Sequence, residues 1–221
     1  MGQNISISTR HGRISAWQAK PHDKPRGALI VVQEIFGVNH HIRQVTDRFA
    51  NYGYLAIAPA LFDRVSPGTE LGYDEAGVAR GRALAEEVGF NGALDGVRGV
   101  YDLVEGEFRV GVVGYCWGGS VAYLANARIG LPAVSYYGGR TVPLLKERPK
   151  APLMLHFGEN DPLIPPEDVA MHREALDDAA EIHVWPGAGH GFNCDQRPDF
   201  NEAVAKQALD RTLAFFQKNL R

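Results

Sequence analysis

Hydrophobic positions along the chain follow two periods that alternate from the N-terminal to the C-terminal end. Short apolar runs rich in β-branched residues are typical of strands, and positions repeated every three or four residues are typical of helices that cover a sheet. The predicted strands are residues 4–8, 13–19, 28–32, 55–58, 109–113, 133–137, 153–157 and 182–185. The predicted helices are residues 41–52, 75–88, 93–104, 118–128, 167–179 and 201–219. This alternation predicts an α/β fold with a mostly parallel sheet and helices on both faces.

Three of these segments carry more detail. Residues 4–8 and 13–19 alternate polar and apolar positions, which indicates edge strands. In the predicted helix 41–52, one face carries Ile42, Val45, Phe49 and Tyr52, and we expect that face to be buried.

Length and charge limit the classes of protein to consider. The chain has 221 residues without a repeat or a long linker, which predicts a single domain over residues 1–221. A formal net charge of -3 gives no general attraction to nucleic acid or to acidic membranes. No apolar run reaches membrane-spanning length, the first residues lack a secretory-signal pattern, and two cysteines make no disulfide scaffold. We therefore expect a cytoplasmic monomer or small homo-oligomer that acts on a small molecule.

The strongest chemical motif follows the predicted strand 109–113. It is Gly114-Tyr115-Cys116-Trp117-Gly118-Gly119, and a predicted helix begins directly after it. This is the G-x-S-x-G nucleophile elbow with Cys in place of Ser. The alternative is a structural cysteine beside a glycine turn, since free cysteines are often buried. A helix N-terminus favours a thiolate, so the context favours Cys116 as a nucleophile.

Two further predicted strands end near residues that complete this chemistry. Asp161 follows strand 153–157, and His190 lies in the glycine-rich loop after strand 182–185. Taken alone, Asp161 fits a turn cap and His190 a solvated loop residue. Together with Cys116 they follow the order nucleophile, acid, histidine, which is typical of the α/β-hydrolase fold. Ligands of such sheets bind at the carboxyl ends of the strands, so we expect the three side chains to meet there.

The chemistry of the three residues assigns their roles. Cys116 attacks an ester or lactone carbonyl and forms an acyl-thioester. His190 takes the thiol proton and later activates water, while Asp161 fixes the tautomer of His190. The predicted oxyanion-hole donors are the backbone N–H groups of Trp117 and of the loop near Ile35.

Other side chains near these strand ends are less specific. Glu34 lies in the loop directly after the predicted strand 28–32 and is either a surface carboxylate or a carboxylate in the active-site cleft. Aromatic residues are expected to form the core or an apolar substrate pocket. The candidates for the pocket are Phe36, Tyr115, Tyr137 and Phe192. His40 and His41 lack the spacing of a zinc site, so we predict neither metal nor cofactor. The chain has no insertion large enough for a cap domain, which predicts an open cleft.

Several segments resemble the dienelactone hydrolase (carboxymethylenebutenolidase) family. They are QEIFGVNHHIRQVTDRFANYGYLAIAPALFDR at 33–64, VGVVGYCWGG at 110–119, HFGENDPLIPP at 156–166 and PGAGHGF at 186–192. The resemblance implies an α/β-hydrolase fold with Cys116, Asp161 and His190 as the triad and with Ile35 and Trp117 as oxyanion donors. It also implies that Glu34 is the cleft glutamate, which holds the resting thiol protonated and helps to form the thiolate when substrate binds.

Two positions depart from the family pattern. Gly191 and Cys194 stand where family members with dienelactone activity carry Ser and Arg, and that Arg helps to bind the substrate carboxylate. A second family arginine lies on the helix 75–88, where Arg80 and Arg82 both fit. The alternatives to a dienelactone hydrolase-like enzyme are a general carboxylesterase and a non-hydrolytic binding protein of the same fold. A thiol redox protein would usually carry a C-x-x-C pair, which is absent from the sequence.

Overall fold

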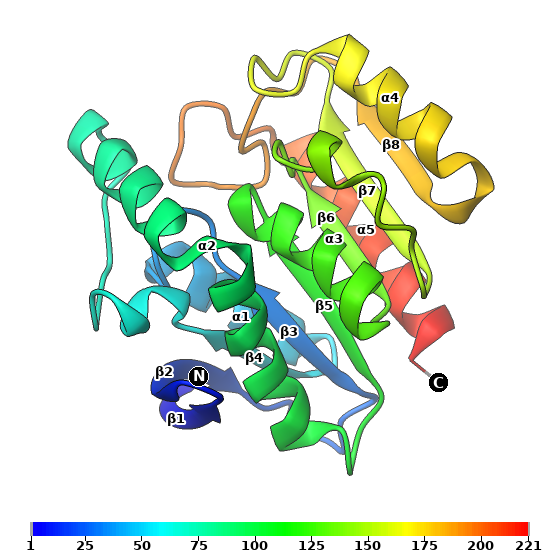
Figure 1. Ribbon diagram of the computed structural model, residues 1–221. Coiled ribbons are helices and arrows are strands. Elements are labelled where there is room, and N and C mark those ends of the chain that lie inside the picture. Colours follow the sequence, from blue (N-terminus) through cyan, green and yellow to red (C-terminus); the bar gives the residue numbers. More distant parts are fainter. Residues whose placement is uncertain (1, 221) are drawn as a thin grey trace. The chain divides into compact units, whose positions relative to one another are not determined.

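The computed structural model describes residues 2–220 and contains one mostly parallel sheet of eight strands (Figure 1). The strand order is β1-β2-β4-β3-β5-β6-β7-β8. The strands are β1 Gln3–Thr9, β2 Gly12–Ala19, β3 Ala28–Val32, β4 Leu55–Pro59, β5 Val110–Tyr115, β6 Ala133–Tyr136, β7 Leu153–Gly158 and β8 Glu181–Trp185. The helices are α1 His40–Asn51, α2 Glu75–Val104, α3 Trp117–Ile129, α4 Pro166–Leu176 and α5 Glu202–Asn219. Each predicted strand and helix is present in the structure, apart from one difference in α2.

The chain divides into two compact units by its internal contacts. The first runs up to Val112 and includes Leu220, and the second is Val113–Asn219. The boundary falls within β5. A single domain over residues 1–221 stays a prediction.

The first unit is built from β1 to β4 with α1 and α2. β1 and β2 form the predicted antiparallel edge pair, β2 pairs antiparallel with β4, and β3 runs parallel to β4. All five residues of β3 are buried, as expected for a strand covered on both faces. The Asn39 side chain caps α1 by accepting a hydrogen bond from the Ile42 N–H at 3.2 Å.

Two details of this unit differ from the sequence-based expectation. Tyr52 was predicted to share the buried face of α1, but it is 43% exposed. The helix ends at Asn51, and Gly53, with φ of 91°, turns the chain away immediately after Tyr52. The predicted helices 75–88 and 93–104 form the single element α2, which is kinked at Gly89 with φ of 62° and ψ of 173°.

The second unit carries β6, β7 and β8, which are parallel neighbours. α3 and α4 lie on one face of these strands and α5 on the other (Figure 1). A buried polar network links the strands to α5: Trp185 Nε1–H donates to His156 Nδ1 at 3.2 Å, and His156 Nε2 lies 3.2 Å from Thr212 Oγ1. Burial, with smaller contributions from His183 and Arg211, lowers the pKa of His156 well below its ordinary value. His156 is therefore a neutral structural residue. Its contact with Thr212 holds β7, the strand that precedes Asp161, against α5.

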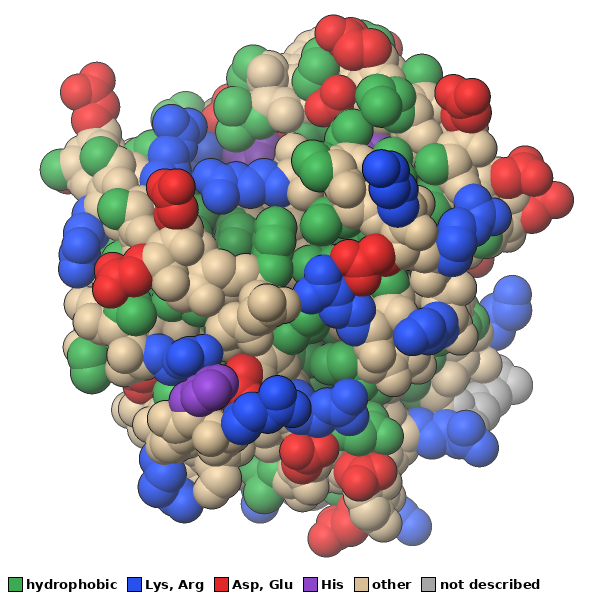
Figure 2. All heavy atoms as spheres, in the orientation of Figure 1, with side chains coloured by type: hydrophobic (Ala, Val, Ile, Leu, Met, Phe, Trp, Pro, Cys, Tyr) green, Lys and Arg blue, Asp and Glu red, His purple; other side chains and the backbone are tan. Residues whose placement is uncertain are grey.

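Charged side chains of both signs are interspersed on the face that Figure 2 draws. α4 and the short 3-10 helix Asp177–Ala179 after it contain the acidic residues Glu167, Asp168, Asp177 and Asp178. Among the residues that the structure describes, no helix is both long and apolar enough to cross a bilayer.

Candidate active site

Cys116 lies at a strained turn between β5 and α3. Its φ of 55° and ψ of -119° are rare for a residue with a Cβ atom, and it is the N-cap residue of α3. The turn is held by hydrogen bonds from the Cys116 N–H to the Tyr136 carbonyl at 3.0 Å and from the Gly119 N–H to the Cys116 carbonyl at 2.9 Å. The thiol is partly exposed and lies at the positive end of a 13-residue helix.

The glycines around Cys116 are required by close backbone approaches. A Cβ atom on Gly114 would lie 1.8 Å from the Gly118 carbonyl oxygen. A Cβ atom on Gly119 would lie 2.7 Å from Ser135 Oγ and 2.8 Å from the Tyr136 carbonyl oxygen. Side chains at these positions would push α3 away from β6 and open the turn. The glycine pattern in the sequence is thus explained by the packing of the elbow.

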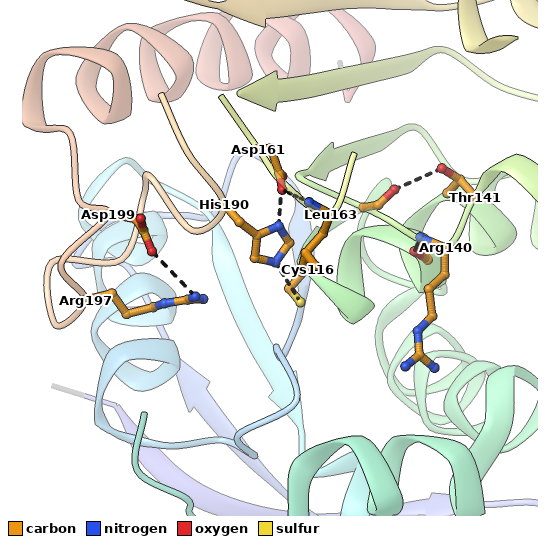
Figure 3. A network of polar contacts seen from close by, with 10 residues as sticks. Cys116, Arg140, Thr141, Asp161, Leu163, His190, Arg197 and Asp199 are labelled. Carbon is orange, nitrogen blue, oxygen red and sulfur yellow. Dashed lines mark hydrogen bonds and ion pairs between the residues drawn. The ribbon is translucent and has the colours of Figure 1, made fainter. Parts of the chain in front are cut away.

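Cys116, His190 and Asp161 form a continuous chain of polar contacts (Figure 3). His190 Nε2 lies 3.2 Å from Cys116 Sγ, and His190 Nδ1 lies 2.8 Å from Asp161 Oδ2. The other oxygen, Asp161 Oδ1, accepts a hydrogen bond from the Leu163 N–H at 2.8 Å. The Asp161 side chain has no exposed surface, and that of His190 is 8% exposed. A buried carboxylate with both oxygens engaged can hold the imidazole in one orientation and one tautomer.

The electrostatics of this chain favour a charged histidine. Burial acts to lower the pKa of His190, but the negative charge of Cys116 and the hydrogen bond to Asp161 outweigh it and raise the pKa to about 10. With this pKa the His190 ring carries a proton at neutral pH.

Aromatic side chains pack around His190. The Tyr137 ring meets His190 edge to face with centroids 5.2 Å apart, and Phe192 meets Tyr137 at 5.2 Å. The Tyr115 ring lies 4.8 Å from that of Tyr136. Tyr137 and Phe192 are fully buried and Tyr115 is 2% exposed, so these rings form the packing around the imidazole. Their contact with substrate stays a prediction.

The remaining predicted site residues belong to the first unit. Glu34 follows β3 and has no exposed surface, which excludes the surface-carboxylate alternative. A Glu34 carboxylate oxygen lies within 4.8 Å of a ring nitrogen of His41, which is also buried. No sequence pattern pairs Glu34 with His41, although the loop that carries Glu34 leads directly into α1, where His41 lies.

Ile35 and Phe36 continue that loop and are both buried. A Cβ atom on Gly81 would lie 2.1 Å from the Ile35 carbonyl oxygen, so α2 packs directly against the loop. Arg80 and Arg82 flank this contact on α2, and both are exposed. Glu34, Ile35, Phe36 and both arginines belong to the first unit. That they line the same site as Cys116 stays a prediction.

Two arginines of the second unit were missed by the sequence analysis. Figure 3 draws Arg197 and Arg140 on opposite sides of Cys116. Arg197 lies in the loop between His190 and α5, and Arg140 follows β6, where its N–H donates to Ser120 Oγ at 3.2 Å. Cys194, which stands where the family carries an arginine, has a fully buried side chain.

Comparison with known proteins identifies the family of the chain. The family model described as the dienelactone hydrolase family matches residues 14–220. A carboxymethylenebutenolidase of Pseudomonas putida is 30% identical over 224 residues, which cover 96% of this chain and 95% of the relative. A solved structure from Klebsiella pneumoniae is 33% identical, covers 98% of both chains and superposes with a TM-score of 0.87.

A more distant solved structure bears on the fold alone. The dienelactone hydrolase of Anabaena variabilis is 17% identical and covers 100% of this chain and 99% of its own, with a TM-score of 0.71. Over residues 2–220 the match indicates no separate cap domain beside the sheet and its helices. The predicted fold class is confirmed.

Proposed function

Because the chain belongs to the dienelactone hydrolase family and is an ester or lactone hydrolase, we propose that it cleaves its substrate through a Cys116–His190–Asp161 triad. The observation that carries this proposal is the unbroken chain from Cys116 Sγ to His190 Nε2 at 3.2 Å and from His190 Nδ1 to Asp161 Oδ2 at 2.8 Å. A nucleophile, a proton carrier and a buried carboxylate in this order form the arrangement that acyl transfer requires.

The reaction follows from the protonation of the pair. The Cys116 thiolate attacks the carbonyl carbon, and the carbonyl π electrons move to the oxygen. When the tetrahedral intermediate collapses, the C–O bond to the leaving alcohol breaks and His190 Nε2 gives its proton to that oxygen. The product is an acyl-thioester on Cys116 and a neutral imidazole. His190 then removes a proton from water, the hydroxide adds to the thioester, and the thiolate leaves as the carboxylic acid forms.

Stabilisation of the oxyanion is assigned to backbone groups. Trp117 is the first residue of α3, where helix N–H groups have no intrahelical acceptor. We assign one donor to the Trp117 N–H and the second to the Ile35 N–H in the loop after β3. Removal of one such donor typically costs about 100- to 1,000-fold in kcat.

Glu34 is proposed as the residue that moderates the thiolate. A carboxylate without exposed surface opposes a nearby negative charge, which would limit adventitious alkylation and oxidation of the thiol. His190 Nε2 also lies 3.2 Å from Cys116 Sγ, so both His190 and Glu34 are proposed to act on the thiol. The rate of Cys116 alkylation with and without the Glu34 charge measures how the two residues act on the thiol.

A substrate panel with trapping of the intermediate tests the proposal. Lactones, dienelactones and p-nitrophenyl esters are incubated with wild type and with Cys116→Ala, and intact-protein mass spectrometry follows the acyl-enzyme. Wild type should turn over a member of the panel and carry the acyl group on Cys116, whereas Cys116→Ala should do neither.

The second cysteine is an internal control. Cys194 is fully buried and Cys116 is partly exposed, so iodoacetamide should label Cys116 first and abolish activity at one equivalent. Full activity after stoichiometric labelling of Cys116 would contradict the triad. If wild type turned over no member of the panel, a non-hydrolytic binding protein of the same fold would be the better interpretation.

A further inference from the structure

Tyr137, the residue directly after β6, has a left-handed backbone with φ of 40°. Among the residues that the structure describes, the other non-glycine residues with positive φ are Cys116 and Asp177. β5 and β6 are neighbours in the sheet, so Cys116 and Tyr137 follow the carboxyl ends of adjacent strands. Residues with a Cβ atom rarely adopt this conformation, and where they do, they often lie at functional sites.

The positive φ explains the direction of the Tyr137 ring. Successive side chains of an extended strand point to opposite faces of the sheet. The rings of Tyr136 and Tyr137 nevertheless both meet Phe192, with centroids 6.1 Å and 5.2 Å away. Both also meet the ring of Tyr115, at 4.8 Å and 6.3 Å. The turn of the backbone therefore brings Tyr137 into the same aromatic group as Tyr136, where it meets the imidazole of His190 edge to face at 5.2 Å.

Hydrogen bonds fix the backbone of this turn. The Tyr137 N–H donates to the His156 carbonyl on β7 at 2.8 Å. The carbonyl of the preceding residue, Tyr136, accepts from the Cys116 N–H at 3.0 Å. Two consecutive residues thus contact the two reacting partners of the proposed triad, one through the backbone of the nucleophile and the other through the ring of the base. The turn after β6 therefore connects the position of Cys116 to that of His190.

The imidazole needs a contact of this kind in addition to its hydrogen bond with Asp161. The bond from His190 Nδ1 to Asp161 Oδ2, at 2.8 Å, fixes one atom of the ring and leaves the ring free to tilt about that atom (Figure 3). Tilting would move Nε2 away from Cys116 Sγ, which lies 3.2 Å from it. Tyr137 has no exposed surface, so its ring is a rigid wall against the imidazole.

We propose that Tyr137 is a positioning residue whose ring holds the plane of the His190 imidazole, so that Nε2 stays directed at Cys116 Sγ. The inference rests on the proposed triad and adds a fourth residue that acts through His190. It assigns the effect to the aromatic ring and not to the phenol hydroxyl. Proton transfer depends on the alignment of donor and acceptor, so a loss of this contact affects the chemical step more than the binding of substrate.

Four variants separate the ring, the hydroxyl and general packing. Tyr137→Phe keeps the ring, whereas Tyr137→Leu and Tyr137→Met remove it, and the flexible Met side chain refills the space if Leu does not fold. Tyr123→Leu is the matched control, because Tyr123 is a buried tyrosine of α3 whose hydroxyl donates to the Glu147 carbonyl at 3.0 Å. kcat and KM are measured separately with the ester that wild type turns over fastest. NMR follows the Nδ1–H resonance of His190, assigned by its loss in His190→Gln, and urea unfolding gives the stability of each variant.

The ring-free variants should lose turnover selectively. Tyr137→Leu and Tyr137→Met should lower kcat by about 10- to 100-fold, as expected for a misplaced reacting group, with KM within about threefold of wild type. Their His190 Nδ1–H resonance should broaden, because the ring samples several orientations. Tyr137→Phe should retain a sharp resonance and most of kcat. Tyr123→Leu should lose stability, as any buried ring does, and retain both the resonance and kcat.

Three results would overturn the inference. A sharp, unshifted resonance in both ring-free variants would show that Asp161 alone orients His190. Equal losses of kcat in Tyr137→Phe and Tyr137→Leu would assign the effect to the hydroxyl, and equal losses in Tyr137→Leu and Tyr123→Leu would assign it to general packing. A wild-type enzyme that turned over no ester would contradict the proposed function and the inference with it, whereas turnover that survives in the ring-free variants contradicts the inference alone.

Discussion

The strained backbone of Cys116 leads to a prediction about stability. Cys116→Ala and Cys116→Gly both remove the sulfur and its contact with His190, and they differ from each other by one Cβ atom. In Cys116→Ala that atom remains at φ of 55° and ψ of -119°, a conformation that residues with a Cβ atom rarely adopt. In Cys116→Gly the strain is relieved. We expect the glycine variant to be more stable than the alanine variant, opposite to the usual effect of Gly in a helix interior.

The size of the difference follows from two opposing contributions. A non-glycine residue held in a sparsely populated conformation costs about 1–3 kcal/mol. Glycine loses more backbone freedom on folding, which costs roughly 0.5–1 kcal/mol relative to alanine. The net expectation is that the free energy of unfolding of Cys116→Gly exceeds that of Cys116→Ala by about 1 kcal/mol. For a chain of this size that corresponds to a Tm higher by roughly 2–4 °C.

Urea and thermal unfolding followed by circular dichroism measure this difference. Ala127→Gly is a matched control on the same helix, because Ala127 is buried in α3 and an interior glycine costs about 1 kcal/mol. The control should be destabilised while Cys116→Gly is stabilised relative to Cys116→Ala. Equal stability of the two Cys116 variants, or a less stable glycine variant, would show that the turn stores no strain at Cys116.

Two further predictions concern the charges at the site. In Cys116→Ala the pKa of His190 should fall, because burial still acts to lower it while the Cys116 charge that raises it is gone. NMR titration of the His190 ring in wild type and in the variant measures this pKa. An unchanged titration would contradict the ion pair. Glu34→Gln should speed alkylation of Cys116 by iodoacetamide in the absence of substrate and impair turnover, because it removes a buried negative charge with little change of shape. Identical alkylation rates across the pH range in wild type and Glu34→Gln would show that Glu34 does not act on the thiol.

The regular elements were predictable because each depends on local sequence. The run Ala28–Val32 is bounded by polar residues and is buried throughout, so its limits coincide with β3. The family resemblance, which rests on contiguous motifs, is confirmed by the match over residues 14–220. The expectations that were wrong depend on geometry at element ends. A helical projection places Tyr52 with Ile42 and Phe49, but the helix stops one residue before Tyr52.

The polar contacts of the candidate site were only partly predictable. The order of Cys116, Asp161 and His190 after three parallel strands predicts that they meet, since the carboxyl ends of such strands share one edge. The proximity of Glu34 and His41 depends on the path of a loop, which the pattern of apolar and polar residues does not predict. The exposed fraction of Glu34 likewise depends on how α2 packs on the loop, where Gly81 allows the closest approach.

Two departures from the family pattern, at positions 191 and 194, illustrate how a loop can link them physically. A buried cysteine stands at position 194, where the family carries an arginine. The loop brings the guanidinium of Arg197 onto Gly191, where a Cβ atom would lie 2.7 Å from Arg197 Nη1. The glycine therefore leaves the space that the arginine from farther along the loop occupies. Because His190 precedes Gly191, a side chain at position 191 would displace this arginine and change the packing beside the histidine.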